Sequence, residues 1–587
     1  MPGVLSRRPY WPAHGGLRRE ISARLIVAGA IIIAPAAGAF AAPAPLSPND
    51  PSRVVPGPPA PTSQPLQFHA APPDQTAQDT SARFVLTGVK FDHATALGEA
   101  RLAPAWSGLK GKSVSLSDLR TVGGRAEAIY AKAGFPFVAV VLRVQEIEGG
   151  VVHFDVIEGR VSDLTVLGTN PTARRQATAA LEPLVNRTPL SVYTVNKDYQ
   201  LARDVPGLSI AGTLRRGSEP GGMDLVVQAK RDEWRTYFNV NNLYADPVGP
   251  WGFLVGVDHF GASEHGDQTS LQVYSSVPFG RQVLVRGSES VRLNSMGTTV
   301  GVSALWGQAN PEGNLAPLAL ATNVVTVRVE VSQPLWKQPD ASLLVDLALE
   351  GSDQKTSVFT SFGLSDDKLR DLSLSFAGEK SGRFGRIAVT AELHQDLDIL
   401  GASHAGDFNL SRLGANPQAT ILRAGLEGET KPFQGVRLAM RIDSQYSGSA
   451  LTAPDQYSAG NLTIGRGYEP GSALGDSAVA GAFEMRFGPA DFGHGLKVQP
   501  FVFVDVVRMW NHGFAPFAER TLDSYGGGLR FQIAGKLHLD LLVADPQRSP
   551  LGLGDPTPGP TVLMNFTVGL NDLFSAIHRR IASGVGK

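Results

Sequence analysis

Very few residues of this 587-residue chain have the types and spacing that covalent chemistry requires. Cysteine is absent, and the 12 histidines are scattered without the spacing of metal ligands. The sequence lacks the H-E-x-x-H, G-x-S-x-G and G-x-x-x-x-G-K-S/T motifs of zinc hydrolases, serine nucleophiles and phosphate-binding loops. The formal net charge of −1 provides no basic field for nucleic acid. We predict no catalytic residues, no metal, no cofactor and no nucleic-acid partner, and keep a membrane-bound hydrolase as an alternative.

Two polar positions near the C-terminus could instead form an ion pair. Arg466 lies in a glycine-rich loop, and Asp505 lies in a strand-like stretch. A bidentate guanidinium–carboxylate pair is the strongest side-chain link available in a wet interior. Gly467 would allow a tight turn, and Tyr468 would add an aromatic face and a hydroxyl. Judged from the spacing in the sequence alone, the commoner case is that such an arginine lies in an exposed loop and does not contact the aspartate of the strand.

The N-terminus predicts export from the cytoplasm. Residues 1–41 combine five arginines, a short apolar run at 25–34 and an Ala-Phe-Ala cleavage site at 39–41. This is the pattern of a secretory signal peptide. The alternative is a membrane-anchor helix, but the run is short and Pro35 interrupts it. The absence of cysteine agrees with passage through an oxidising periplasm.

A proline-rich linker and a first α+β module follow. Residues 42–82 contain 11 prolines between positions 43 and 73, so no packed element is expected there. Residues 83–159 predict a strand, an amphipathic helix and two more strands. The expected strands are 83–91 with a bulge at Gly88, 136–145 and 151–157. The expected helix begins at a Ser-Leu-Ser-Asp capping signal at 115–118, buries apolar residues spaced three and four apart, and ends at Gly134.

Residues 160–232 repeat this plan as a second module. Strands are expected at 161–167, 208–214 and 223–229, with helices at 172–184 and 191–203. Each module would leave one sheet edge open, and an unfolded client can add a strand to such an edge.

Residues 233–574 change to a two-residue alternation of apolar and polar side chains. The alternation is clear at 234–241, 268–273, 537–543 and 562–571, with glycine-rich connections between the runs. After residue 41 no run of 18 apolar residues occurs. One lipid-facing and one water-facing side per strand predict a closed transmembrane barrel of about 16 strands. A soluble β-sandwich or propeller is the alternative. Residues 575–587 are expected to form a C-terminal extension.

Several stretches now resemble one known family. They are FVLTGV at 84–89, LSDL at 116–119, IYAKAGF at 129–135, VVHFDVIEG at 151–159, DVPGL at 204–208, GMDLVV at 222–227, SYGGGLR at 524–530 and ADP at 544–546. Through them the chain resembles the ShlB/FhaC/HecB transporters of two-partner secretion, haemolysin secretion/activation proteins of the BamA-type superfamily. Their periplasmic modules are POTRA domains, here POTRA domain 1 (ShlB-type) at 83–159 and POTRA domain 2 at 160–232.

The resemblance also assigns functional residues. The family places a Val-Arg-Gly-Tyr tip on a loop folded into the barrel and pairs its arginine with the aspartate of a Phe-x-Asp-x-Gly strand. The matching residues here are Arg466, Gly467 and Tyr468 in the loop and Phe503 and Asp505 in the strand. Gly465 replaces the aliphatic residue and Val507 replaces the glycine, while the arginine and the aspartate are kept.

The resemblance implies a fold and a function. The fold is α+β POTRA modules in the periplasm followed by an all-β barrel in the outer membrane of a Gram-negative bacterium. The function is to recognise an unfolded partner exoprotein, β-helical and adhesin- or haemolysin-like, and to pass it through the barrel. Outer-membrane lipid, and the outer-membrane assembly machinery during biogenesis, are the other expected partners. A BamA-type assembly factor is the alternative, which two modules disfavour.

Overall fold

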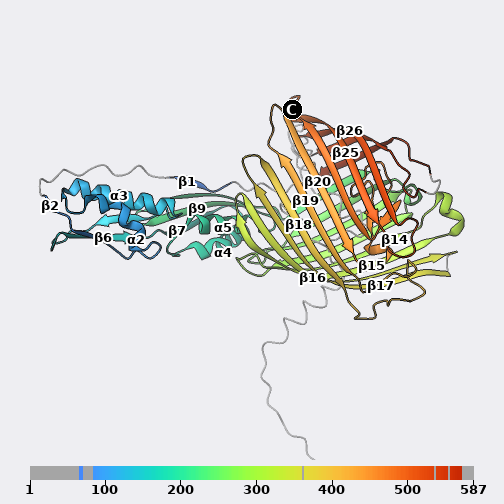
Figure 1. Ribbon diagram of the computed structural model, residues 1–587, viewed down its shortest axis with the longest axis horizontal. Helices are drawn as coiled ribbons and strands as arrows, with labels where there is room; N and C mark the ends of the chain where they lie inside the picture. The colour runs from blue at the N-terminus through green and yellow to red at the C-terminus, as the bar shows by residue number, and fades with distance from the viewer. Residues whose placement is uncertain (1–64, 70–82, 360–361, 535–536, 553–555, 571–587) are drawn as a thin grey trace, which may run out of the picture.

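The computed structural model describes residues 65–69, 83–359, 362–534, 537–552 and 556–570. These residues form two small α+β modules and a large β-barrel, with the modules extending from one side of the barrel (Figure 1). The expected signal peptide at 1–41, most of the linker and the extension at 575–587 lie outside the described residues.

The first module packs one long helix on a three-stranded sheet. Sheet order is β3-β6-β5, with β3 parallel and β5 antiparallel to β6, and a separate pair joins β2 to β4. In chain order its elements are β2 (Phe84–Val85), β3 (Gly88–Asp92), α2 (Glu99–Leu102), η2 (Ala103–Ala105), η3 (Ser107–Leu109), β4 (Ser113–Val114), α3 (Leu116–Lys132), β5 (Ala139–Leu142) and β6 (Val151–Ile157).

The predicted capping of helix α3 is confirmed. The Asp118 amide donates to Ser115 Oγ at 3.2 Å, and the Ser115 amide donates to Asp118 Oδ2 at 2.8 Å. The helix buries Leu119 and Val122 against the sheet and is followed by Gly134 at φ +95°. The hydrogen bond from the Ser115 amide to the ionised carboxylate, together with one from the Ser115 hydroxyl, lowers the pKa of Asp118.

The expected strand at 83–91 is wrong as one continuous element. It breaks before Gly88 into β2 and β3, which belong to different sheets. Leu86 turns into the core with no exposed surface, and the Thr87 amide donates to the Gly150 carbonyl at 2.8 Å. The strand therefore breaks because the Leu86 side chain fills the core. The alternation of residue types in the sequence does not reveal this break.

The second module repeats the first, with the 11-residue helix α4 at the place where the first module has the four-residue helix α2. Its sheet order β8-β9-β7 matches β5-β6-β3, because β7 is parallel and β8 antiparallel to the central strand β9. The elements are β7 (Arg160–Leu167), α4 (Pro171–Leu181), η4 (Glu182–Leu184), α5 (Val192–Arg203), β8 (Leu208–Arg216) and β9 (Gly222–Arg231). Asn170 and Ser191 cap the two helices.

The linker contributes a strand that the sequence did not predict. Residues of β1 (Gln67–His69) pair in parallel with Thr213 to Arg215 of β8 and so cover the edge of the second sheet. Pro65 and the proline pair at 72–73 bracket this short segment but do not fall within it, so its amides remain available as donors. The expectation of no packed element in the linker is therefore wrong at these residues. The open edge expected for the second module is occupied.

Sixteen strands of the described residues form a closed antiparallel barrel, in which the short β24 continues β23. Strand β28 pairs with β10 to close the ring, with Phe238 opposite Val568. The strands are β10 (Trp234–Asn241), β11 (Trp251–Phe260), β12 (Asp267–Val277), β13 (Gln282–Arg292), β14 (Thr299–Ala309), β15 (Ala321–Gln338), β16 (Ala341–Val358), β17 (Phe362–Ser381), β18 (Gly385–Asp396), β19 (Thr420–Thr430), β20 (Val436–Ser447), β23 (Ser477–Phe487), β24 (Ala490–Asp491), β25 (Leu496–Trp510), β26 (Glu519–Ile533), β27 (Leu537–Pro546) and β28 (Thr561–Gly569). Two short 3₁₀ turns, η5 (Asp246–Val248) and η6 (Gly313–Leu318), lie in connections.

The barrel wall is apolar outside and polar inside. On β15 the valines 325, 327, 329 and 331 are 42–47% exposed, whereas Thr326 and Arg328 between them are 8% and 6% exposed. A water-soluble protein would bury the valines and expose the arginine. The opposite distribution is that of a wall surrounded by lipid and enclosing a polar bore. Within the described residues, no helix is both long and apolar enough to cross a membrane.

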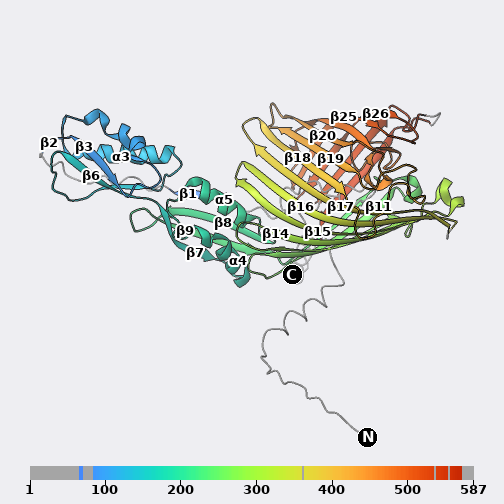
Figure 2. The same cartoon turned by 60° about the horizontal axis from the view of Figure 1, so that its bottom comes forward.

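The second module is fastened to one end of the barrel. Arg292 Nη1 donates to the Leu201 carbonyl at 2.6 Å, and Lys337 Nζ lies 2.6 Å from Asp204 Oδ2. Figure 2 shows α4 and α5 against this end, near β14 and β15. The short turns after β11, β13 and β15 lie at this module end, so the inner loop described below enters from the far end of the barrel.

We expect Val329→Arg to destabilise the barrel in lipid vesicles by about 2–4 kcal/mol, because a charge on the lipid-facing side must leave water. Val85→Arg is the control, since Val85 is 54% exposed on the first module and such a surface change is worth within about 0.5 kcal/mol. Urea unfolding followed by the heat-dependent gel mobility of the barrel measures both. Equal stability of the two variants would mean that β15 does not face lipid.

Candidate functional site

A long connection between β20 and β23 folds into the barrel. This segment, residues 448–476, is called the inner loop. It contains the turn η7 (Ala453–Asp455) and the hairpin β21 (Tyr457–Ala459) with β22 (Ala473–Gly475). Its tip carries Arg466, Gly467 and Tyr468, the residues that the sequence singled out.

The guanidinium of Arg466 binds the carboxylate of Asp505 on β25. Nε donates to Oδ2 at 2.9 Å and Nη2 donates to Oδ1 at 2.6 Å, which is a bidentate pair. The Arg466 amide donates to the same Oδ2 at 2.9 Å, and the Gly465 amide does so at 3.3 Å. The Asp505 side chain is 1% exposed. Asp505 therefore binds both the side chain and the backbone of the loop tip.

A second carboxylate, which the sequence did not single out, completes the contact. Arg466 Nη1 donates to Glu484 Oε1 at 2.6 Å from β23, the strand next to β25. Arg530 and Arg486 also donate to Glu484, at 3.0 Å and 2.8 Å. The Phe503 ring lies under the guanidinium, with its centroid 3.6 Å from Cζ. The tip thus rests on two carboxylates and one aromatic face.

Backbone conformation explains both glycines of the tip. Gly465 has φ +117° and Gly467 has φ +91°, a region that disfavours other residues. A Cβ at Gly467 would lie 2.8 Å from Pro546 Cγ and 3.2 Å from Ala544 Cβ on β27. The tip can approach the wall this closely only without a side chain at 467.

Tyr468 anchors the tip to the next part of the wall. Its ring has no exposed surface, and its hydroxyl lies 3.0 Å from the carbonyls of Asp523 and Arg548 and accepts from the Arg548 amide at 3.1 Å. Val507, which stands where the family has glycine, packs in the same buried cluster as Tyr468 and Leu522. The added side chain fills space beneath the loop and leaves the ion pair intact.

The inner loop also contacts the wall at other places. Leu462, 5% exposed, packs with Tyr237, Leu254, Leu284 and other inward side chains of β10 to β14. In the ring, β26, β27 and β28 lie between β25 and β10, so the loop contacts the wall over a series of neighbouring strands.

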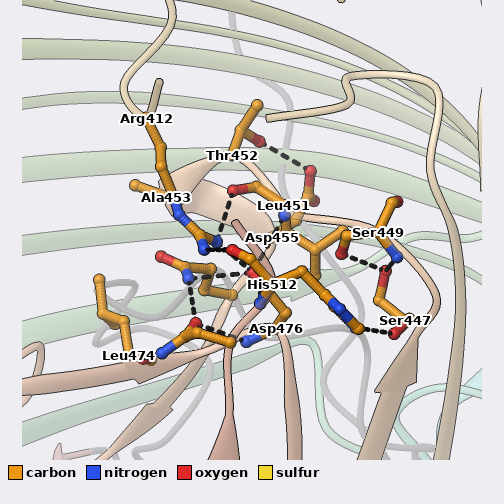
Figure 3. Close-up of polar contacts among 12 residues, drawn as sticks. Arg412, Ser447, Ser449, Leu451, Thr452, Ala453, Asp455, Leu474, Asp476 and His512 are labelled. Carbon is orange, nitrogen blue, oxygen red and sulfur yellow. Dashed lines mark hydrogen bonds and ion pairs between the residues drawn. The ribbon is translucent and has the colours of Figure 1, made fainter. Parts of the chain in front are cut away.

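Asp476 joins three long connections at the far end of the barrel (Figure 3). Its carboxylate, which has no exposed surface, pairs with Arg412 from the connection after β18. It accepts from the Leu451 amide at 3.0 Å and from the His512 amide at 2.8 Å. The base of the inner loop is thereby tied to the connections that follow β18 and β25.

The structure places all five sequence-selected residues in one site. Arg466, Gly467, Tyr468, Phe503 and Asp505 meet between the inner loop and β25. Sequence reasoning missed Glu484 and Asp476. Glu484 carries one usable signal, since it falls on the inward positions of a strand in which Phe483 and Met485 point to lipid. Asp476 lies in a connection, where the alternation of residues gives no indication of burial.

Comparison with known proteins identifies the family. The family model of the POTRA domain, ShlB-type, matches residues 84–159. The family model of the haemolysin secretion/activation protein ShlB/FhaC/HecB matches residues 251–531. The heme/hemopexin transporter protein HuxB of Haemophilus influenzae (strain 86-028NP) is 22% identical over 464 residues, covering 74% of this chain and 78% of HuxB. The outer membrane transporter CdiB of Dickeya dadantii (strain 3937) is 23% identical over 216 residues, covering 34% and 38%.

Solved structures share the fold. CdiB from Escherichia coli superposes with a TM-score of 0.70 at 15% identity, covering 85% of this chain and 92% of that one. CdiB from Acinetobacter baumannii gives a TM-score of 0.60 at 13% identity, covering 86% and 94%. The barrel, the module order and the matched sequence stretches agree. The chain therefore belongs to the haemolysin secretion/activation ShlB/FhaC/HecB family, the outer-membrane transporters of two-partner secretion with periplasmic POTRA domains.

Proposed function

We propose that this transporter recognises one unfolded partner protein in the periplasm and passes it through the barrel once the inner loop has moved aside. The observation that carries the proposal is the loop tip. Arg466 is held in the bore by the carboxylates of Asp505 and Glu484. The resemblance adds that the partner is β-helical and adhesin- or haemolysin-like.

Ion pairs suit a loop that must be released. A bidentate pair fixes one position of the tip, yet its charged groups can be solvated again when the bore fills with water and client. The groups gathered at the tip are paired carboxylates and arginines, with no nucleophile beside a base among the residues described there. We therefore propose that the chain has no catalytic activity of its own.

Partner recognition is proposed at the outer edge of β5 in the first module. The Val140 amide points away from β6 and donates to Glu127 Oε1 of α3 at 2.9 Å. Val141 is 36% exposed and Val144, just beyond the strand, is fully exposed. The equivalent edge of the second module, on β8, is already covered by β1. A client strand could replace Glu127 as the acceptor for the Val140 amide.

Deleting the gene from its own strain tests the export function. We expect one large protein to disappear from the cell surface and the medium, and plasmid-borne wild type to restore it. Mass spectrometry of the medium and of the outer membrane gives both readouts. A general loss of other outer-membrane barrels would support the BamA-type alternative instead. Hydrolysis of a substrate by the purified barrel alone would contradict the absence of catalysis.

Asp505→Asn is expected to loosen the inner loop and to reduce secretion severalfold. Loss of one partner of a buried pair costs about 3–5 kcal/mol. We expect the lower end, because Glu484 still compensates Arg466. Ion conductance in planar bilayers should rise as the tip leaves the wall.

Arg508→Gln is the matched control for Asp505→Asn. Arg508 lies on the same strand and pairs with Glu519, but both side chains are about half exposed. An exposed pair contributes about 0–1 kcal/mol, so conductance and secretion should be unchanged. If Asp505→Asn behaves like Arg508→Gln, the tip contact does not hold the loop. We also expect Asp505→Arg with Arg466→Asp to fail as a rescue, since the new aspartate would face Glu484.

Val140→Pro is expected to reduce secretion while leaving the barrel inserted. Proline removes the amide that faces the open edge but no hydrogen bond to β6, and edge strands tolerate it. Val144→Pro, outside the strand, is the control and should secrete normally. Secretion by Val140→Pro at the wild-type level would exclude strand addition at β5.

A further inference from the structure

A second group of ionisable side chains lies in the bore, away from the loop tip. This lumen cluster consists of Asp371 on β17, Glu392, His394 and Asp396 on β18, and Asp455 in the turn η7 of the inner loop. Each of these residues is at most 8% exposed. The three β18 residues are alternate positions of one strand, so they share its inward face.

The lumen cluster carries more negative charge than its protein neighbours balance. Glu392 is paired with Arg423, whose Nη1 lies 2.8 Å from Oε1. Among the described residues, Asp371, Asp396 and Asp455 make no ion pair with lysine or arginine. The His394 imidazole faces Asp371 and Asp396, and Asp455 lies within 4.8 Å of it and accepts from the Thr452 hydroxyl at 3.0 Å. Three buried carboxylates around one histidine require a further positive charge, either protons or a cation.

The arrangement of atoms favours a cation. One ligand atom each of His394, Asp396 and Asp455 lies within 4.8 Å of the other two, and His394 Nε2 is 3.0 Å from Asp396 Oδ1. On the other side of the ring, Nδ1 faces Asp371 Oδ1 at 3.5 Å. A carboxylate behind one ring nitrogen, with further carboxylates before the other, is how proteins orient a metal-binding histidine.

Buried polar atoms without hydrogen bonds also support a bound cation. In the part of the chain that the structure describes, Asp396 Oδ2, Asp371 Oδ1 and His394 Nδ1 have no hydrogen-bond partner. Asp396 is 2% exposed and His394 is 4% exposed, so bulk water does not satisfy them. Buried polar atoms rarely remain unsatisfied.

We propose that His394, Asp396 and Asp455 bind a divalent transition-metal ion of the zinc class, with Asp371 orienting the imidazole. Neutral imidazole together with carboxylate suits Zn²⁺, whereas Ca²⁺ and Mg²⁺ take oxygen ligands. The spacing of histidines along the sequence gave no sign of this site, because Asp455 reaches it only through the fold of the inner loop.

The metal ion would fasten the inner loop to the wall at a second place. Asp455 belongs to the loop, and His394 and Asp396 belong to β18, whereas the tip is held at β25. The consequence of this metal binding for export rests on the proposed function. Metal binding itself does not, because His394 and Asp396 belong to the wall, so Asp505→Asn should still bind Zn²⁺ whatever its effect on secretion.

Zn²⁺ titration of the purified full-length protein tests the site. After stripping with EDTA, we expect the wild type to bind one Zn²⁺ per chain that His394→Ala does not bind. Asp455→Asn should bind more weakly, and Asp371→Asn should lose about 10–100-fold in affinity. His404→Ala is the matched control, since His404 is 59% exposed beside an exposed Asp398 and should leave binding unchanged. Isothermal titration and elemental analysis give affinity and stoichiometry, and gel mobility verifies that each barrel is folded.

The wild type also provides a test that needs no variant. Its unfolding temperature should be higher in Zn²⁺ than in EDTA, and Ca²⁺ at the same concentration should not reproduce the increase. Equal unfolding temperatures in Zn²⁺ and EDTA would overturn the proposal and leave protons as the compensating charge. Equal Zn²⁺ binding by the wild type and His394→Ala would overturn it too, as would loss of binding in His404→Ala.

Discussion

The interior of this protein depends on the pairing of charges that face a polar bore. Much of the barrel wall places its apolar side chains outward, as on β15, so an inserted loop finds only separate apolar clusters in the bore, such as the one that Tyr468 forms with Val507 and Leu522. Any segment that enters the bore must satisfy its backbone and its charges from the wall. The inner loop does so through Asp505, which accepts from two amides and one guanidinium of the tip.

The same constraint explains why polar contacts recur along the whole inner loop. Asp476 neutralises Arg412 and accepts two amides at the base of the loop, and the Tyr468 hydroxyl contacts the backbone of Asp523 on β26 and of Arg548 in the connection after β27. Apolar contacts are confined to small clusters such as that of Leu462. Each fastening is therefore local, and releasing one need not unfold the wall, whose strands are joined by their own ladders.

The sequence predicted the periodic features best. The helix at 116–132, its cap at Ser115, the tandem modules and the closed barrel follow from local rules of spacing, and the structure agrees. Features that depend on tertiary packing were not predicted. Leu86 divides an expected strand because the core accepts its side chain, and Gln67–His69 becomes a strand because β8 offers an edge.

The residues of the candidate site divide in the same way into those that the sequence selected and those that only the fold reveals. Arg466 and Asp505 were selected through a family resemblance, since spacing alone favoured no contact between residues so far apart in the chain. The strand pattern places Glu484 on the inward face, but its contact with Arg466 and the His394 group could not be predicted, because they depend on which residues the fold brings opposite each other. A strand pattern gives the face of a residue but not its neighbour across the bore.

The balance between holding and releasing the inner loop follows from these contacts. An apolar core of comparable size would resist release, because exposing each buried methylene costs about 0.8 kcal/mol with no compensation from water. Charged groups differ: leaving one charge of a buried pair without its partner costs about 3–5 kcal/mol, whereas an ion pair exposed to water contributes only about 0–1 kcal/mol. Entry of water and client into the bore would therefore weaken the grip of Asp505 on Arg466 at the moment when the loop has to move. The closed position can then be stable at rest and inexpensive to leave during transport.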